Sequence, residues 1–372
     1  MKERFSVLDS FRGLAALCVV MYHMHFVDTL TESNFFRGSF VFVDFFFVLS
    51  GFVLAHGYGY RTNLKFREFF RRRFLRLFPL HVVMLLGFIG FEASRWVAMH
   101  HFGFSFNSMP FSGSQDVSEI LPNLLLLQAW LPSADAFSFN APSWSISVEF
   151  YMYLLLFLTL LLGACFKQIA WLFLALAGAY LTLNTTIWSN IFGLSNEVLR
   201  GLVGFFGGTV VYLLYRQFKG LSAFEASNPK VFAVLFTVFE AASILSLIHM
   251  VSNNTVTNNL NLIGLFCFVV LLFSFEKGLI ARSLRASFFQ YLGKISYSIY
   301  LTHSLVLLCF NALIIAIQKN LPGAGFTFVE AGGRHFDGGN AGINYLLMVV
   351  VTLVIIAVSH MTFHQVERRW YK

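Results

Sequence analysis

Residues 11–23 read FRGLAALCVVMYH, an apolar run with Arg12 near its start and His23 at its end. Such a run is typical of a membrane-spanning helix, and at about 100° per residue the two side chains share one helix face. They lie about 16 Å apart along the helix axis. Ionisable side chains inside a bilayer are costly unless they are partnered, so they often mark a functional site. An arginine that snorkels to the headgroups and a histidine that only packs would give the same pattern.

The composition indicates a membrane protein with many spans. Of 372 residues, 57% are hydrophobic and only 12% are charged, and the mean hydropathy is +0.70. Soluble globular domains carry about 25% charged residues. Spans use nearly the whole length, so we expect one integral-membrane domain over residues 1–372. No small-residue cleavage site follows the first apolar run, so we expect this segment to remain as a signal anchor.

Ten apolar stretches are candidates to cross a bilayer. Most of the 26 lysines and arginines flank these stretches on one side, which the positive-inside rule assigns to the cytoplasm. The sequence therefore predicts an all-α bundle of ten transmembrane helices with both termini cytoplasmic. The net charge of +8 then reflects membrane orientation, and nucleic-acid binding is not expected. The predicted spans are 11–27, 39–57, 77–100, 143–164, 168–187, 196–215, 230–250, 259–276, 293–318 and 343–364.

The sequence has no clear motif for a metal ion or a nucleotide. Its four cysteines lie inside apolar runs without metal-type spacing, so we expect no zinc and no disulfide bond. His360, His364 and Glu367 recur at helical spacing, but no His-Glu-x-x-His motif accompanies them. The glycine-rich external loop 319–342 lacks a phosphate-binding fingerprint. It would be either a flexible linker or a loop that admits an acceptor.

A basic cluster precedes the third span, where residues 67–79 read REFFRRRFLRLFP. Arg73 and Arg76 are three residues apart, so on a helix they point the same way. Two neighbouring guanidinium groups at a membrane surface suit a phosphate-bearing ligand, because the planar fork matches phosphate oxygens bidentately. The positive-inside rule and anionic lipid headgroups would also account for the cluster.

Three ionisable residues fall at similar depth in the outer part of the predicted bundle. Asp44 in the second span lies roughly 7 Å below the outer surface, and His23 lies at comparable depth on the antiparallel first span. A hydrogen bond between them would orient the imidazole, as the third member of a catalytic triad does. Glu149 enters the fourth span from outside, so we expect it to converge on the same place. His303 lies near mid-membrane on the ninth span, where it would line a cavity or only pack.

Five short motifs follow one another along the chain. They are LDSFRGLAA at 8–16 with the Arg12–His23 pair, VDFFFVLSGF at 43–52, RRFLRLFP at 72–79, WSISVEF at 144–150 and SYSIYLTH at 296–303. In order and approximate spacing they resemble the membrane-bound acyltransferase family 3, whose members include O-antigen and exopolysaccharide O-acetylases. The ten-span layout also matches this family. The sequence is similar to the stand-alone form, which has no additional periplasmic esterase-like domain.

The resemblance implies an O-acyltransferase of the bacterial cytoplasmic (inner) membrane. It would transfer an acyl group, usually acetyl, from cytoplasmic acyl-CoA to a hydroxyl of a cell-envelope or exported glycan. Acyl-CoA would be a co-substrate, and no cofactor or metal would be bound permanently. Arg12, Arg73 and Arg76 would bind the acyl-CoA, and His23 would be the general base or a transient acyl carrier.

The other residues of the matched motifs have supporting roles in this interpretation. Asp44 and Glu149 would orient His23 or the acceptor, and Ser50, Tyr297 and His303 would line the cavity. The expected partners are the carbohydrate acceptor and membrane lipids. Two other classes remain open from the residues: a transporter or flippase of a lipid-linked saccharide, and a passive scaffold that would tolerate loss of the buried charges.

Overall fold

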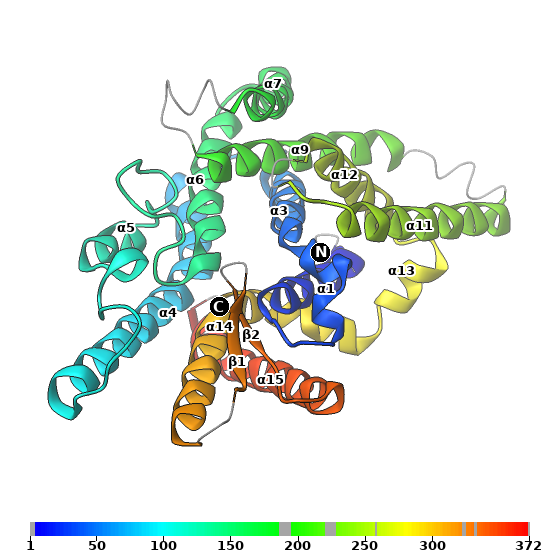
Figure 1. Ribbon diagram of the computed structural model, residues 1–372. Helices are drawn as coiled ribbons and strands as arrows, with labels where there is room; N and C mark the ends of the chain where they lie inside the picture. Colours follow the sequence, from blue (N-terminus) through cyan, green and yellow to red (C-terminus); the bar gives the residue numbers. More distant parts are fainter. Residues whose placement is uncertain are drawn as a thin grey trace.

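The structure is a computed structural model, which describes residues 4–185, 195–219, 228–256, 259–321, 325–330 and 333–370. Within these residues each of the ten predicted spans overlaps a helix, although the first helix ends at His23, before the predicted end of its span at residue 27 (Figure 1). Residues 186–187, the end of the fifth predicted span, lie outside the described residues. The helices are α1 (Ser6–His23), α3 (Phe42–Tyr58), α4 (Phe66–Phe102), α6 (Trp144–Leu160), α7 (Ala164–Leu183), α9 (Asn196–Phe218), α11 (Pro229–Ser252), α12 (Leu260–Ser274), α14 (Ser287–Asn320) and α15 (Ala341–Thr362).

These helices have the length and composition of membrane spans. Of the helices in the described residues, eight are long and apolar enough to cross a membrane. The helix α12 is apolar but has only 15 residues, and α1, which contains Asp9 and Arg12, is not among the eight. The prediction of a polytopic helical membrane protein is therefore confirmed.

Short helices connect the long ones. They are η1 (Leu30–Glu32), α2 (Asn34–Arg37), η2 (Ser39–Val41), η3 (Gly113–Gln115), η4 (Val117–Glu119), α5 (Ile120–Leu124), η5 (Ala141–Ser143), α13 (Leu279–Leu284), the π-helical turn η7 (Phe363–Glu367) and α16 (Arg368–Trp370). The helix α13 begins at a buried carboxylate, because Glu240 accepts hydrogen bonds from the backbone N–H groups of Gly278, Ile280 and Ala281. Glu240 is therefore a structural contact between α11 and α13.

The helix α4 is longer than its predicted span 77–100. It begins at Phe66, so the basic motif and the membrane span form one continuous helix of 37 residues. Arg73 and Arg76 therefore project from the same helix about one turn apart, as their spacing predicted. Because the arginines belong to a long helix, their backbone positions are fixed relative to the bundle.

The helices α1 and α14 run parallel and in close contact. Gln290 donates a hydrogen bond to Ser10 Oγ at 2.7 Å near the start of both helices. Gly13 then packs against Gly293, and His23 lies beside His303 near the end of α1. Small residues at such crossings let two backbones approach closely inside a membrane. The pairing fixes how the predicted site residues of α1 face α14.

Away from the α1–α14 pair, the helix α9 packs beside α3, α7 and α12 and forms the centre of that part of the bundle (Figure 1). Phe47 and Phe52 of α3 are buried there together with Phe205 and Phe206 of α9. Aromatic side chains of this size dominate the packing energy of a core. Many of the 47 phenylalanines therefore hold helices together, and they indicate no ligand by themselves.

One β-hairpin interrupts the helical architecture within the predicted loop 319–342. Its strands β1 (Thr327–Glu330) and β2 (Gly333–Phe336) pair antiparallel. Phe26, just after α1, forms a parallel bridge with Phe336. This small hairpin is an addition to the all-α architecture, and the backbone after α1 offers β2 further hydrogen-bond partners. Residues 322–324 and 331–332 of this loop lie outside the described residues.

The two ends of the described chain lie on the same side of the bundle. Arg4 and Arg368 line one cavity together with residues from the start of α1 and the end of α3. An even number of crossings gives this result. That this side faces the cytoplasm follows from the basic residues and stays a prediction. Lys2 and Lys372, which contribute to that argument, lie outside the described residues.

Candidate active site

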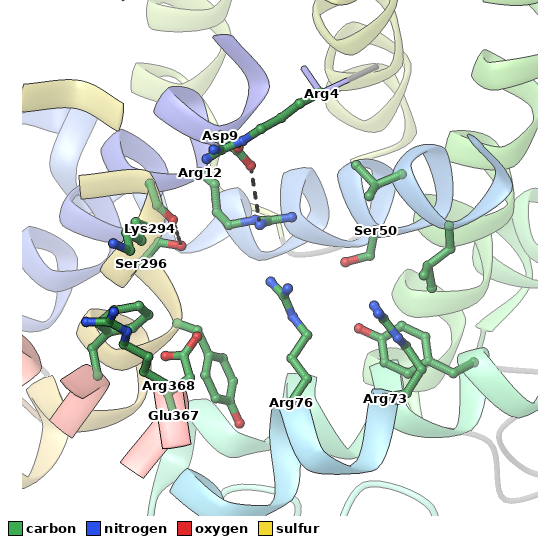
Figure 2. A pocket seen from close by; sticks show the side chains of 16 residues that line it. Arg4, Asp9, Arg12, Ser50, Arg73, Arg76, Lys294, Ser296, Glu367 and Arg368 are labelled. Carbon is green, nitrogen blue, oxygen red and sulfur yellow. Dashed lines mark hydrogen bonds and ion pairs between the residues drawn. The ribbon is translucent and has the colours of Figure 1, made fainter. Parts of the chain in front are cut away.

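A large cavity lies among α1, α3, α4, α6, α14 and the C-terminal segment η7–α16 (Figure 2). Its volume is about 500 Å³. Six basic side chains and two acidic ones line it, which gives it a net positive charge. The basic residues are Arg4, Arg12, Arg73, Arg76, Lys294 and Arg368, and the acidic residues are Asp9 and Glu367. A cavity of this size and charge suits a ligand with several phosphate groups; we call it the inner cavity.

The three arginines that the sequence singled out all line the inner cavity. Figure 2 shows Arg12 reaching in from α1, and Arg73 and Arg76 from α4. The Arg73 guanidinium carbon lies 5.8 Å and 5.9 Å from the ring centroids of Tyr58 and Tyr153. Its Nε atom is buried without a hydrogen-bond partner. Arg73 is therefore held by two aromatic rings, and the hydrogen-bonding capacity of its Nε atom is unsatisfied.

The negative side chains balance only part of this charge. Asp9 accepts a hydrogen bond from Arg4 at 2.8 Å, and its other oxygen lies 3.8 Å from Arg12. Glu367 accepts a hydrogen bond from Ser298 of α14 at 3.0 Å. Glu367 ends the π-helical turn η7, and such turns frequently occur at functional sites.

Sequence reasoning missed four of the charged residues in this cavity. Arg4, Lys294 and Arg368 served only as signals of membrane orientation, and Glu367 was considered only beside two histidines. Charges at the ends of three different spans converge here, because α1, α14 and α15 meet on one side of the bundle. The sequence shows that charged residues cluster at the ends of these spans, but it does not show that they meet in one cavity.

A smaller cavity of about 60 Å³ continues from the inner cavity into the bundle. The two cavities share Arg12, Ser50, Arg76, Ser296 and Tyr297. The smaller one extends past Glu149 and Ser145 to Tyr300. Of the three residues expected to line the cavity, Ser50 and Tyr297 line both of these cavities and His303 lines neither. The two cavities form a path from the cationic end toward the middle of α14.

Glu149 does not reach His23, in contrast to its expected position. Ser50 and Tyr153 both donate hydrogen bonds to Glu149 Oε1, the latter at 2.5 Å. The carboxylate lines the smaller cavity together with Arg12 and Arg76. Its depth on α6 was predictable, but the direction of its side chain, which faces the arginines, was not. Glu149 is therefore a negative group among the cations.

Asp44 does not bond to His23 either. Arg200 of α9 donates to both Asp44 oxygens, at 2.9 Å and 3.3 Å, and both side chains are almost fully buried. The Arg200 guanidinium also lies over the Trp144 ring, 5.0 Å from its centroid. A buried arginine needs a counter-charge, and Asp44 is the one that α3 supplies. The expected convergence of His23, Asp44 and Glu149 is therefore wrong.

The His23 ring contacts the ring of His303 on α14 as well as that of its chain neighbour Tyr22. His303 Nε2 lies 3.3 Å from His23 Nδ1, and the ring centroids are 5.0 Å apart. His303 is fully buried, whereas His23 is partly exposed. His23 Nδ1 also lies 2.9 Å from the carbonyl oxygen of Val19. Two helices thus hold the His23 ring from one edge and leave another part of it accessible.

One aromatic layer separates the smaller cavity from these histidines. Tyr300 lines the cavity, and its ring centroid lies 6.1 Å from that of His303. Tyr300 is anchored by Pro142 O at 3.0 Å and by Ser145 Oγ at 2.8 Å. Neither cavity is lined by His23 itself. The path from the arginines therefore ends at Tyr300, beside the histidine pair.

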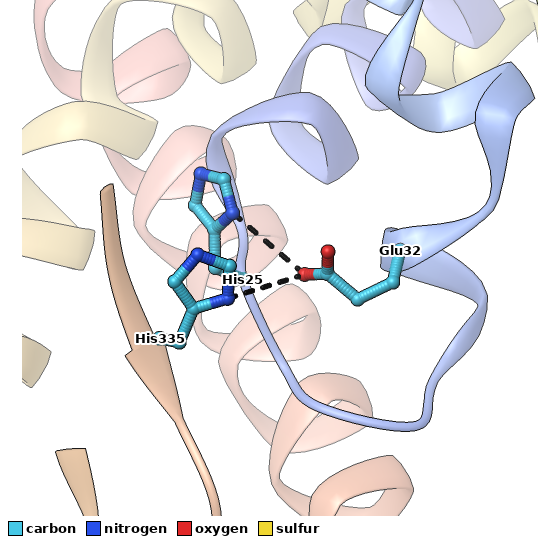
Figure 3. Close-up of side chains that lie close together, drawn as sticks. All are labelled: His25, Glu32 and His335. Carbon is cyan, nitrogen blue, oxygen red and sulfur yellow. Dashed lines mark ion pairs between the residues drawn. The ribbon is translucent and has the colours of Figure 1, made fainter. Parts of the chain in front are cut away.

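A cluster of potential metal ligands, His25, Glu32 and His335, lies near the β-hairpin (Figure 3). Glu32 Oε1 is 3.7 Å from His25 Nδ1 and 3.9 Å from His335 Nδ1. Two histidines and a glutamate are typical zinc ligands. However, Arg37 Nη1 lies 2.8 Å from His25 Nδ1.

The position of Arg37 opposes a cation at this cluster. Carbonyl oxygens of Met21, Met24 and Thr31 hold its guanidinium at 2.9, 2.6 and 2.7 Å. The guanidinium cannot leave without breaking these bonds, and its charge would repel a metal ion bound by His25. The cluster therefore gives no support to a metal site.

Comparison with known proteins gives a family for nearly the whole chain. The family model described as an acyltransferase domain matches residues 5–361. Acyltransferase MdmB of Streptomyces mycarofaciens is 35% identical over 162 residues, which cover 41% of this chain and 38% of MdmB. No solved structure matches the chain significantly.

Two further relatives have names that mention a glycan. The putative peptidoglycan O-acetyltransferase YrhL of Bacillus subtilis is 38% identical over 96 residues, which cover 25% of this chain and 13% of YrhL. Peptidoglycan O-acetyltransferase OatA of Listeria monocytogenes is 34% identical over 83 residues, which cover 21% of this chain and 12% of OatA. The matched part is thus less than half the length of each of these curated relatives.

Proposed function

The chain belongs to the acyltransferase family whose model spans residues 5–361, and we propose that it transfers an acyl group from acyl-CoA to a glycan hydroxyl. The acyl-CoA binds at the inner cavity, on the cytoplasmic side of the membrane. The acceptor is a cell-envelope or exported glycan that approaches His23 from the outer side. Acetyl is the expected acyl group, and the bacterial cytoplasmic membrane is the expected location.

The observation that carries this proposal is the charge of the inner cavity. Coenzyme A carries phosphate groups at one end, which bind guanidinium groups through charge-assisted hydrogen bonds. Arg73, with its unpartnered Nε, and Arg76 lie on one helix where such phosphates would enter. Arg12 lies where the inner cavity continues into the smaller one, so it would contact the part of the donor nearer the thioester.

The smaller cavity is the route for the narrow pantetheine arm. At about 60 Å³ it is too small for a nucleotide, but it leads from the arginines to Tyr300. A modest rotation of the Tyr300 ring would open the remaining layer to the histidine pair. Side-chain rotations of this kind are rapid compared with enzyme turnover. The thioester could then reach His23 while the phosphates remain with the arginines.

His23 supplies the chemistry in one of two ways. As a general base it takes the proton of the acceptor hydroxyl, whose oxygen attacks the thioester carbonyl while the carbon–sulfur bond breaks. The leaving CoA thiolate then takes up the proton from His23. As an acyl carrier, its Nε2 attacks the thioester carbonyl and the carbon–sulfur bond breaks to release CoA thiolate. The acceptor hydroxyl then attacks the acyl carbon, the nitrogen–acyl bond breaks, and the hydroxyl proton goes to the CoA thiolate. In both mechanisms, Asp44 maintains the fold through its ion pair with Arg200. Glu149 offsets part of the positive charge of the arginines that hold the donor.

The glycan acceptor is inferred from relatives. YrhL and OatA are named as peptidoglycan O-acetyltransferases, which favours a polysaccharide hydroxyl as the acceptor. MdmB is named only as an acyltransferase. The acceptor sugar would be lipid-linked or already exported, because His23 lies at the end of α1 opposite the inner cavity.

Acyl transfer by purified protein in lipid nanodiscs tests the proposal. Radiolabelled acetyl-CoA is the donor, and peptidoglycan fragments or lipid-linked oligosaccharides are the acceptors. We expect the wild type to label the glycan and His23→Ala to lose this activity. His249→Ala is the control, because His249 is exposed on α11 and lines neither cavity. Saccharide movement across the membrane without consumption of acetyl-CoA would instead identify a transporter or flippase.

A further inference from the structure

The hydrogen bonds around the two histidines determine where their protons lie. His23 Nδ1 is 2.9 Å from Val19 O, and His303 Nδ1 is 3.2 Å from Ile299 O. A carbonyl oxygen only accepts a hydrogen bond, so a neutral imidazole in this position must carry its proton on Nδ1. Both rings are therefore in the Nδ1–H form. This leaves Nε2 of each ring with a lone pair.

The lone pair of His303 faces the N–H group of His23. His303 Nε2 lies 3.3 Å from His23 Nδ1, so the His23 proton is shared between Val19 O and His303 Nε2. Ser304 Oγ is 3.4 Å from the same His303 nitrogen and is at the limit of hydrogen-bond distance. His303 itself is fully buried, so few other partners compete for its lone pair. The His23 ring is thereby oriented with its Nε2 directed away from His303.

We propose that His303 is the positioning residue of His23, the role that sequence reasoning gave to Asp44. This inference rests on the proposed function, because it concerns the reactivity of His23 Nε2. When Nε2 takes the hydroxyl proton, positive charge develops on the ring and the Nδ1–H group becomes a stronger donor. Its bond to His303 strengthens at that moment and stabilises the imidazolium. The same orientation presents Nε2 as the nucleophile if His23 carries the acyl group.

The apolar surroundings of His23 explain why its partner is a neutral imidazole and not a carboxylate. A carboxylate beside His23 would need its own compensation in an apolar environment, and the carboxylate on α3 is already paired with Arg200. An imidazole offers a hydrogen-bond acceptor without a buried charge. Two adjacent imidazoles also resist double protonation, so the pair accepts only one additional proton. His303 therefore assists proton uptake by His23 without holding a permanent charge.

Two substitutions of His303 test this role by steady-state kinetics. His303→Leu removes the acceptor, and we expect kcat to fall roughly 100-fold with little change in the KM for acetyl-CoA. His303→Gln places an amide oxygen near the position of Nε2, and we expect it to restore at least part of the loss. A kcat for His303→Leu within threefold of the wild type would overturn the proposal. So would equal losses in the leucine and glutamine variants when both unfold at the wild-type temperature.

The wild-type protein gives a second test that needs no activity. Nitrogen NMR of histidine-labelled protein in lipid, with His23→Ala used to assign the signal, reports which His23 nitrogen carries the proton. We expect a protonated Nδ1 and an unprotonated Nε2. The opposite tautomer would overturn the proposal even in an active enzyme. Failure of the wild type to use acetyl-CoA would instead defeat the proposed function and leave this spectroscopic test intact.

Discussion

Gly13 of α1 lies directly against Gly293 of α14, so closely that a Cβ atom on Gly13 would come within 2.6 Å of the Gly293 nitrogen. Ten residues further along each helix, His23 meets His303. The helices run parallel, so the glycine contact near the inner cavity sets the distance between the histidines about 15 Å away. Packing at one end of α1 thus controls the geometry of the chemistry at the other.

Gly293→Ala should separate α1 from α14. Its new Cβ atom would meet Asp9 O at 2.0 Å, a distance that real structures do not tolerate. We expect a loss of stability of about 1–3 kcal/mol from overpacking, together with lower acyl transfer. Thermal unfolding in detergent measures the first and the nanodisc assay the second. Gly90→Ala on α4 is the control, because apart from its chain neighbours and its own helix backbone nothing lies within 4 Å of its Cβ position; equal behaviour of the two variants would contradict the glycine contact.

Arg73→Gln should weaken donor binding more than catalysis. The substitution removes a guanidinium that lines the inner cavity but does not touch the histidines. A charged hydrogen bond contributes about 1.5–3 kcal/mol, so we expect the KM for acetyl-CoA to rise roughly 10–100-fold at similar kcat. Arg369→Gln serves as the control, since Arg369 is exposed and lines neither cavity. An unchanged KM for Arg73→Gln would remove this arginine from the donor site.

Substitutions at Asp44 and Arg200 distinguish a structural ion pair from a catalytic carboxylate. Asp44→Asn leaves Arg200 buried without its counter-charge, which should cost about 3–5 kcal/mol of stability. The double variant Asp44→Leu/Arg200→Met removes both charges, so we expect it to recover much of the stability and keep acyl-transfer activity. A double variant that is stable but inactive would return Asp44 to the reaction.

The protein should not require a metal ion at the cluster of His25, Glu32 and His335 near the β-hairpin. Arg37 is fixed beside His25 and repels a cation, so we expect dialysis against a chelator to leave both the unfolding temperature and acyl transfer unchanged. Metal analysis of the purified protein provides the independent check. Stoichiometric zinc, lost together with stability on chelation, would show that Arg37 moves aside.

Apolar run length was sufficient to locate the ten helices, because a bilayer demands long apolar segments with internally bonded backbones. The arginines were predictable for a similar reason: Arg73 and Arg76 share a helix, so their spacing alone sets their common direction. Asp44 and Glu149 were misplaced because sequence gives depth along a helix but not the neighbour that the side chain faces. A single buried arginine in the sixth span, Arg200, was the available sign that Asp44 had another partner.

His303 shows a different limit. The sequence placed it near mid-membrane but could not decide between packing and lining a cavity. Its contact with His23 depends on the parallel course of α1 and α14, two helices separated by most of the chain. Equal ten-residue spacings from Gly13 to His23 and from Gly293 to His303 were present in the sequence. They acquire meaning only when the two glycines are known to touch.

The most direct test of the account is a cryo-electron microscopy structure of the protein in nanodiscs with a non-transferable acetyl-CoA analogue. We expect the CoA phosphates beside Arg73 and Arg76, the pantetheine arm in the smaller cavity, and Tyr300 rotated aside. The acyl carbon should lie about 3.5 Å from His23 Nε2 or from a water or hydroxyl bonded to it. An analogue bound elsewhere, or one whose acyl end stops below an unmoved Tyr300 with His23 sealed from it, would contradict the account.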